Sequence, residues 1–211
     1  SGNKLSFMKF FVYMGSMSCG ALFFFTGENL EFGIICSVLA SIGFSGSIVF
    51  YNSFLPEIAK EEEFDLLSAK GFALGYIGSV ILLVINLLTI QFPEWFGMPT
   101  GSFAPRFSFL ITGIWWVGFA QIPFRVLPNN PYKKSISSDY LWKGYREVSL
   151  VFRELRSIPV ANQFLASFFF YSMGVQTVMY LAASFGDKEL GMPGDHLILT
   201  VLIIQLVAIG G

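Results

Sequence analysis

Charged side chains are scarce in this chain. Its 211 residues include 13 Lys or Arg and 14 Asp or Glu, which is about half the charged fraction of an ordinary soluble domain. The near balance of the two signs leaves no basic field for binding nucleic acid, so we expect no nucleic-acid partner. With two Cys and one His, the sequence has neither a disulfide framework nor the ligand spacing of a zinc site. We therefore expect no metal and no cofactor.

Apolar residues are abundant instead, at 54% of the chain, with 25 Phe among them. A helix that crosses the hydrocarbon core of a bilayer needs about 20 such residues. The strict alternation of a membrane β-barrel strand is missing. We predict an all-α fold, a polytopic transmembrane helical bundle whose six apolar segments are 5–25, 32–55, 71–92, 107–127, 160–185 and 197–211.

The two ends of the chain suggest a longer protein. The chain starts with Ser1 rather than Met, has no signal-peptide pattern, and enters an apolar segment almost at once. The sixth segment is still apolar where the chain stops at Gly211. We expect an internal piece of a larger membrane protein.

Basic residues predict the orientation, because Lys and Arg are enriched in cytoplasmic loops. Arg106 and Lys188 fall in one set of loops. The other 11 of the 13 basic residues fall in the alternate set: Lys4, Lys9, Lys60, Lys70, Arg125, Lys133, Lys134, Lys143, Arg146, Arg153 and Arg156. We therefore place the loops 56–70 and 128–159 in the cytoplasm and the turns 26–31, 93–106 and 186–196 outside.

The long loop 128–159 contains a predicted amphipathic helix. Leu141, Tyr145, Val148, Phe152 and Leu155 recur at steps of four and three residues, which places them on one helical face. One interpretation is a helix lying on the cytoplasmic leaflet with its basic residues near lipid headgroups. The other is a regulatory or partner-binding helix.

Small residues that let helices approach closely recur in three segments. The segment 71–92 opens with Gly71, Gly75 and Gly78. The segment 32–55 carries two adjoining small faces, and the segment 5–25 carries two small pairs. The faces of the segment 32–55 are Ser37, Ser41 and Ser45 on one side and Gly43 and Ser47 on the other. The pairs of the segment 5–25 are Gly15 with Cys19 and Ser16 with Gly20. We predict that such faces mark helix–helix contacts.

Three strings resemble one family of transporters. They are YNSFLPEIA at residues 51–59, SAKGFALGYIGS at 68–79 and FYSMGVQTVMY at 170–180. Together they resemble the vacuole-effluxer-like (autophagy-related permease) branch of the major facilitator superfamily. The resemblance implies twelve helices in two halves, of which this chain would hold the third to the eighth. Residues 1–127 would end the first half, 128–159 would be the central loop and 160–211 would start the second half.

The same resemblance implies a secondary active transporter, which moves a small polar solute such as an amino acid by alternating access. A bacterial cytoplasmic (inner) membrane is the expected location, and a coupling ion is a further expected partner beside the lipid bilayer and the solute. The usual arginine of the superfamily's fourth helix is absent, since residues 32–55 contain no basic residue. No ionisable residue lies deep in any complete segment, so we expect any coupling charge to lie elsewhere.

Candidate solute-binding groups are polar residues near the middle of the segments, where transporters of this kind bind their substrates. They are Ser41, Ser45, Asn86, Gln176 and Tyr180. Hydrogen bonding between helices is the competing interpretation for each of them. Gln121 and Ser172 are further polar residues of the same kind.

Candidate gating residues lie in the cytoplasmic loop 56–70. Asp65 or Glu57 could pair with Lys70, or with basic residues outside the chain, and hold one state of the transporter. A solvated acidic turn is the alternative. An enzyme is not expected, because no paired acids, metal ligands or activated nucleophile can be found. A channel or a structural membrane protein is the alternative function, although no filter loop or ring of charges supports a channel.

Overall fold

A computed structural model describes residues 4–99, 101–128 and 140–210. Helices are the regular elements of the described chain, and they are listed here in order. They are α1 (Lys4–Ala21), η1 (Leu22–Phe24), α2 (Leu30–Asn52), α3 (Leu55–Ile58), η2 (Glu61–Glu63), α4 (Phe64–Gln91), η3 (Pro93–Phe96), α5 (Phe103–Val126), α6 (Tyr140–Arg156), α7 (Pro159–Lys188) and α8 (Gly194–Gly210). The all-α prediction is confirmed.

Five helical stretches are long and apolar enough to cross a membrane. They are Lys4–Phe24, Leu30–Ile58, Glu61–Gln91, Phe103–Val126 and Pro159–Lys188, and α8 is a shorter apolar helix. The protein is therefore a multi-pass integral membrane protein. α4 begins at Phe64, seven residues before the predicted apolar segment, because helical hydrogen bonding continues from the apolar segment into the charged residues that precede it.

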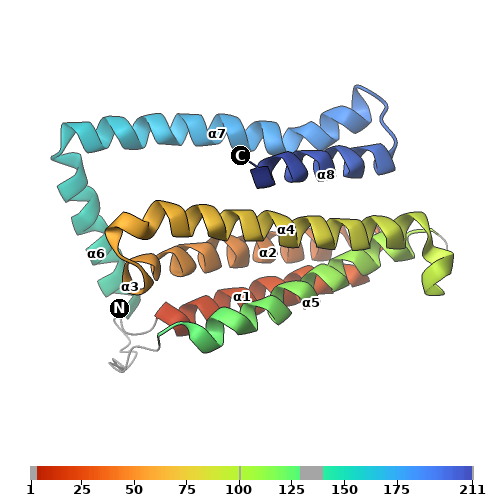
Figure 1. Cartoon of the computed structure of the whole chain (residues 1–211), viewed down its shortest axis with the longest axis horizontal. Coiled ribbons are helices and arrows are strands. Elements are labelled where there is room, and N and C mark those ends of the chain that lie inside the picture. Colours follow the sequence, from red (N-terminus) through yellow and green to blue (C-terminus); the bar gives the residue numbers. More distant parts are fainter. Residues whose placement is uncertain (1–3, 100, 129–139, 211) are drawn as a thin grey trace. The chain divides into compact units, whose positions relative to one another are not determined.

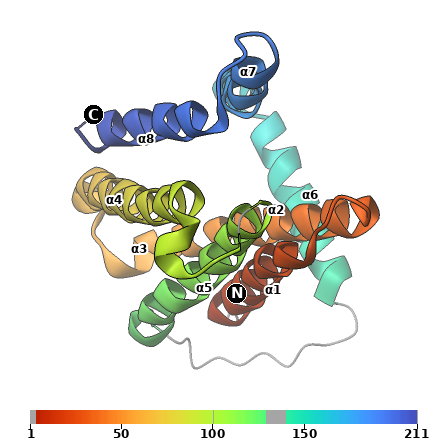
Figure 2. The ribbon, with the colours of Figure 1, turned by 90° about the vertical axis from the view of Figure 1, so that its right-hand side faces the viewer.

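The chain forms two units, residues 1–133 with 198–211 and residues 134–197. In the first unit α1 packs against α2 and α5, and α4 contacts α5 (Figures 1 and 2). In the second unit α6 meets α7 at a sharp corner. The predicted helix of the long loop corresponds to α6, although residues 129–139 and the side chains of 140–145 and 147 lie outside the described set. Whether the segments belong to two halves of a larger transporter stays a prediction.

Close backbone contact joins α1, α2 and α5. A Cβ on Gly43 of α2 would lie 2.5 Å from the Cα of Gly15 on α1, and a Cβ on Gly113 of α5 would lie 2.7 Å from the carbonyl oxygen of Ser16. Such distances leave no room for any side chain, so these glycines let three helices meet at their backbones. The small-residue prediction therefore identified real contacts at Gly15, Gly43 and Ser16.

Two other predicted small faces have no partner in the described chain. A Cβ on Gly71, Gly75 or Gly78 of α4 would meet no described atom within 4 Å. Ser37, Ser41 and Ser45 of α2 are exposed, whereas Gly43 and Ser47 are buried. Of the two adjoining faces predicted on this helix, the glycine-containing one packs and the serine-only one stays open.

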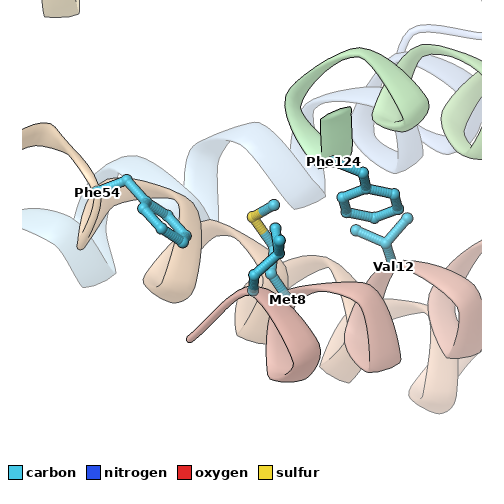
Figure 3. Close-up of a cluster of buried hydrophobic side chains, with 5 residues drawn as sticks. Met8, Val12, Phe54 and Phe124 are labelled. Carbon is cyan, nitrogen blue, oxygen red and sulfur yellow. The ribbon is translucent and has the colours of Figure 1, made fainter. Parts of the chain in front are cut away.

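An apolar cluster closes the end of this helix group at which α1 begins and α2 ends. Met8 and Val12, one turn apart on α1, point toward Phe54 at the end of α2 and toward Phe124 on α5 (Figure 3). Leu5 completes the cluster, in which every member is less than 9% exposed. Lys9 places its ammonium 5.4 Å from the centre of the Phe124 ring, where the ring face attracts a cation.

Candidate functional site

The helix α2 presents two chemically different sides. Gly33, Cys36, Gly43 and Ser47 are buried, and they form its packing side. Ser41 and Ser45 are exposed. Ser41 and Gly43 are two residues apart, which is about 200° around a helix of 3.6 residues per turn. The two candidate serines therefore face away from the α1 and α5 contacts, on a side that the described chain leaves uncovered.

The hydroxyls of this region satisfy their donors within their own helices. Ser41 donates to the carbonyl oxygen of Ser37 at 2.9 Å, and Ser47 donates to that of Phe44 at 2.8 Å. A hydroxyl that donates to its own helix still has lone pairs for accepting a hydrogen bond. The exposed Ser41 can thus accept a hydrogen bond from a solute without exposing an unpaired group when the solute leaves.

Two amide oxygens lie in a different situation. The side-chain oxygens of Asn86 on α4 and Gln205 on α8 are inaccessible to solvent and have no hydrogen-bond partner in the described chain. An unpaired buried acceptor costs about 1–3 kcal/mol, so such groups normally find a partner. Asn86 was a predicted site residue, whereas Gln205 was not singled out. Gln205 could have been found in the sequence as a single amide within the apolar segment 197–211.

The predicted residues of α7 belong to the second unit. Gln176 and Tyr180 are one turn apart on this helix and both are exposed, with Tyr180 at 79%. Ser172, one turn before Gln176, is half-buried. The three therefore share one helical face. Gln121 of α5 instead donates to the carbonyl oxygen of Val117 at 2.8 Å, which ties its amide to its own helix.

The two candidate gating residues do not pair with each other. Asp65 and Lys70 are both exposed, and no ion pair joins them in the described chain. They are five residues apart on α4, about 140° around the helix, whereas pairs four residues apart face each other.

Glu57, also considered as a gating residue, has a different partner. The ammonium of Lys4 lies 2.5 Å from the carboxylate of Glu57 and donates to the carbonyl oxygen of Ser53 at 3.1 Å. It also lies 5.8 Å from the centre of the Phe54 ring. Lys4 therefore ties the start of α1 to the end of α2 and to α3.

An arginine performs the corresponding task at the opposite end of α1. Arg106, in the first turn of α5, donates from Nε to the carbonyl oxygen of Phe23 at 2.8 Å and lies 5.3 Å from the ring centre of the same residue. A cation and an aromatic ring thus connect α5 to η1 at one end and to α1 at the other, where Lys9 lies over Phe124.

Comparison with known proteins decides the family. The model of the family described as vacuole effluxer Atg22-like matches residues 1–65 and 62–211. The chain belongs to the vacuole-effluxer-like branch of the major facilitator superfamily. The uncharacterized MFS-type transporter YxiO of Bacillus subtilis is 32% identical over 208 residues, which cover 98% of this chain and 48% of that protein.

Fungal members of the branch are similar over a shorter region. Autophagy-related protein 22-1 of Penicillium rubens is 31% identical over 157 residues, covering 69% of this chain and 25% of that protein. Autophagy-related protein 22 of Yarrowia lipolytica is 25% identical over 167 residues. The chain thus spans about half the length of the bacterial relative and about a quarter of the fungal ones. No solved structure matches.

Proposed function

We propose that the protein to which this chain belongs is a secondary active transporter, which moves a small polar solute across a bacterial cytoplasmic membrane by alternating access. One observation carries the proposal: the exposed serine side of α2, opposite the side that packs on α1. Hydroxyls at successive turns of this uncovered side are available to bind a polar solute. Because the chain belongs to a transporter family, we propose that this side of α2 contacts the solute.

The chemistry of the candidate residues favours an uncharged or zwitterionic solute. Ser41 and Ser45 offer hydroxyls, Asn86 and Gln176 offer amides, and Tyr180 offers a phenol. None of these groups carries a charge at neutral pH, so none would bind a net anion or cation through an ion pair. Amino acids, which carry no net charge and present an ammonium donor and a carboxylate acceptor, are therefore the first solutes to test.

Coupling to an ion requires a group that this chain does not supply within its spans. The sequences of α2 beyond Glu31, of α4 beyond Lys70 and of α5 between Arg106 and Arg125 contain no Asp, Glu, Lys, Arg or His. Intramembrane carboxylates and histidines are the usual carriers of a coupled proton or sodium ion. We propose that any coupling group belongs to helices outside this chain.

The membrane assignment is also a proposal. YxiO, which aligns with nearly the whole chain, comes from a bacterium, and the fungal proteins align with less of it. A bacterial multi-pass transporter would reside in the cytoplasmic membrane. Expression of the full-length protein with a fluorescent tag, followed by separation of membrane fractions, tests this assignment.

Uptake into proteoliposomes tests the proposed activity. The full-length protein should accumulate one or more radiolabelled amino acids with saturable kinetics. Ser41→Ala and Ser45→Ala should each raise KM about two- to tenfold, the value of a neutral hydrogen bond. Asn86→Leu, Gln176→Leu and Tyr180→Phe test the remaining candidates in the same assay. Ser79→Ala is the matched control, because Ser79 donates to the carbonyl oxygen of Tyr76 within α4 and is half-buried.

Three results would contradict the proposal. A flux that never saturates with solute concentration would indicate a channel. Unchanged KM and rate in both serine variants would remove the α2 side from the site. No flux of any amino acid, sugar or nucleoside by folded protein would favour a structural role.

A further inference from the structure

Two helices of the first unit each carry an amide whose oxygen has no partner. The side-chain oxygens of Asn86 on α4 and Gln205 on α8 are inaccessible to solvent, and no donor in the described chain bonds to either of them. The two amides therefore do not satisfy each other. A buried acceptor without a donor is unfavourable, and native proteins rarely leave one in that state. Each oxygen needs an N–H or O–H group that the described chain does not supply.

The helices that carry these amides are neighbours. Residues 198–211, which include most of α8, belong to the same unit as α4. Figures 1 and 2 both show α8 beside α4, and the colours of Figure 1 show that the two helices run in opposite directions. Asn86 and Gln205 thus belong to two adjacent antiparallel helices of one unit.

Burial indicates which sides of the two helices meet. Each helix has a half-buried stripe with the same spacing of three and then four residues, which follows one helical face. The stripes are Leu83, Asn86 and Ile90 on α4, and Leu202, Gln205 and Ile209 on α8. On α8 the intervening Ile203, Ile204, Leu206 and Val207 are exposed. An amide is the central residue of each stripe, so an antiparallel contact between the stripes brings the two amides close together.

Two neighbouring acceptors favour one class of ligand group. A primary ammonium has three N–H donors and no acceptor, so it can donate to both oxygens at once. A carboxylate or a phosphate offers only acceptors and would meet the negative ends of both amide dipoles. The aliphatic residues of the stripes provide no competing donor. The arrangement therefore suits the amino end of a solute and not its acidic end.

We propose that Asn86 and Gln205 together bind the ammonium group of the transported solute, and that α8 closes against α4 once the solute is in place. Both oxygens are inaccessible in the described arrangement, so the solute reaches them before this closure. With the ammonium present, closure no longer leaves two acceptors unpaired. The assignment rests on the proposed transport function, to which it adds Gln205 and a solute class, the primary amines.

Cross-linking tests the juxtaposition without any solute. Asn86→Cys and Gln205→Cys are combined in full-length protein from which Cys19 and Cys36 have been removed, and a short bis-methanethiosulfonate reagent is added. The matched control combines Asn86→Cys with Ile203→Cys, because Ile203 is 53% exposed and lies about 200° from Gln205 around α8. The first pair should cross-link much faster than the control. Equal rates for the two pairs, or no cross-linking of the first pair, would overturn the proposal.

Transport with a matched solute pair tests the ammonium contact. The substrate is the amino acid that the wild type takes up fastest, and the competitor is its N,N,N-trimethyl derivative, which keeps both charges but has no N–H donor. Asn86→Leu and Gln205→Leu should each raise the KM of the amino acid about ten- to a hundredfold, the value of a hydrogen bond from a charged donor. Neither should raise the inhibition constant of the trimethyl derivative. Gln91→Leu, an exposed amide at the end of α4, should change neither value.

The outcomes separate this assignment from the proposed transport function. Amino-acid uptake with unchanged KM in both leucine variants would overturn the ammonium assignment alone. Equal weakening of the amino acid and its trimethyl derivative would also overturn it, because the amides would then bind a water molecule or support the helix contact. No amino-acid uptake by folded wild-type protein would contradict the proposed solute class and the ammonium assignment with it.

Discussion

Gly15 of α1 and Gly43 of α2 touch backbone to backbone, so that a Cβ on Gly43 would lie 2.5 Å from the Cα of Gly15. A methyl group at this position has to push two helices apart. Because lipid provides little hydrophobic drive for helix association, close packing of this kind supplies much of the attraction between α1 and α2.

Gly43→Ala and Gly113→Ala should therefore each destabilise the protein by about 1–3 kcal/mol, the usual cost of overpacking. Gly118→Ala on the same helix as Gly113 is the control, because a Cβ there meets no described atom within 4 Å. Thermal unfolding of the detergent-solubilised protein measures the difference. Equal melting temperatures for Gly43→Ala and Gly118→Ala would show that the two helices do not meet as described.

The ion pair of Lys4 with Glu57 should be worth about 0.5–1 kcal/mol, because both side chains are partly exposed, at 26% and 37%. Lys4→Gln and Glu57→Gln should each lower stability by this amount. The double variant should lose less than the sum of the two, which is the signature of a direct interaction. High salt should reduce the coupling, and Glu61→Gln, whose carboxylate is exposed in the same turn, should change nothing. Strict additivity would argue against the pair.

Asp65 and Lys70 should act separately if they contribute to gating, since they lie about 140° apart around α4. We propose that each meets a partner outside this chain. Asp65→Lys should then slow solute exchange in proteoliposomes and change the accessibility of cytoplasmic cysteines, and Lys70→Asp in the same protein should not restore either property. Restoration by the double reversal would show that the two residues pair directly in another state. Wild-type behaviour of Asp65→Lys would leave only a solvated acidic turn.

The distribution of Lys and Arg predicts which ends of the helices face the cytoplasm. Lys60 precedes η2 and should be inside, whereas Glu94 lies in η3 and should be outside. In a cysteine-free background, a membrane-impermeant maleimide applied to intact cells should label Glu94→Cys but not Lys60→Cys. Permeabilised cells should allow labelling of both. Labelling of Lys60→Cys alone in intact cells would invert the topology.

The apolar segments were predictable because their lengths follow from the thickness of the bilayer. The start of α4 was not, because the acidic turn before Gly71 is helical without being apolar. On α2, composition identified small residues on two adjoining faces but could not say which face meets α1. That choice depends on Gly15 standing opposite Gly43, which is a property of the pair and not of either segment.

Candidate site residues were harder to predict. A polar residue in an apolar segment is visible in the sequence, but its hydrogen-bond state is not. Gln121 is satisfied by Val117 of its own helix, whereas the oxygen of Asn86 has no partner in the described chain. The two residues resemble each other in sequence context, but the bond of Gln121 uses its amide donor, and the unpaired atom of Asn86 is an acceptor that needs a donor from a neighbouring group. The family strings were specific enough to identify the branch without any structure.

The hydrogen-bonded corner at Ser157 and Ile158 has a mechanical consequence. Asn162 holds the last carbonyl of α6, so there is no slack between the two helices. A tilt of α7 would therefore turn α6 with it, because no flexible connection takes up the movement. If the proposed alternating-access cycle moves α7, α6 is the element that follows it.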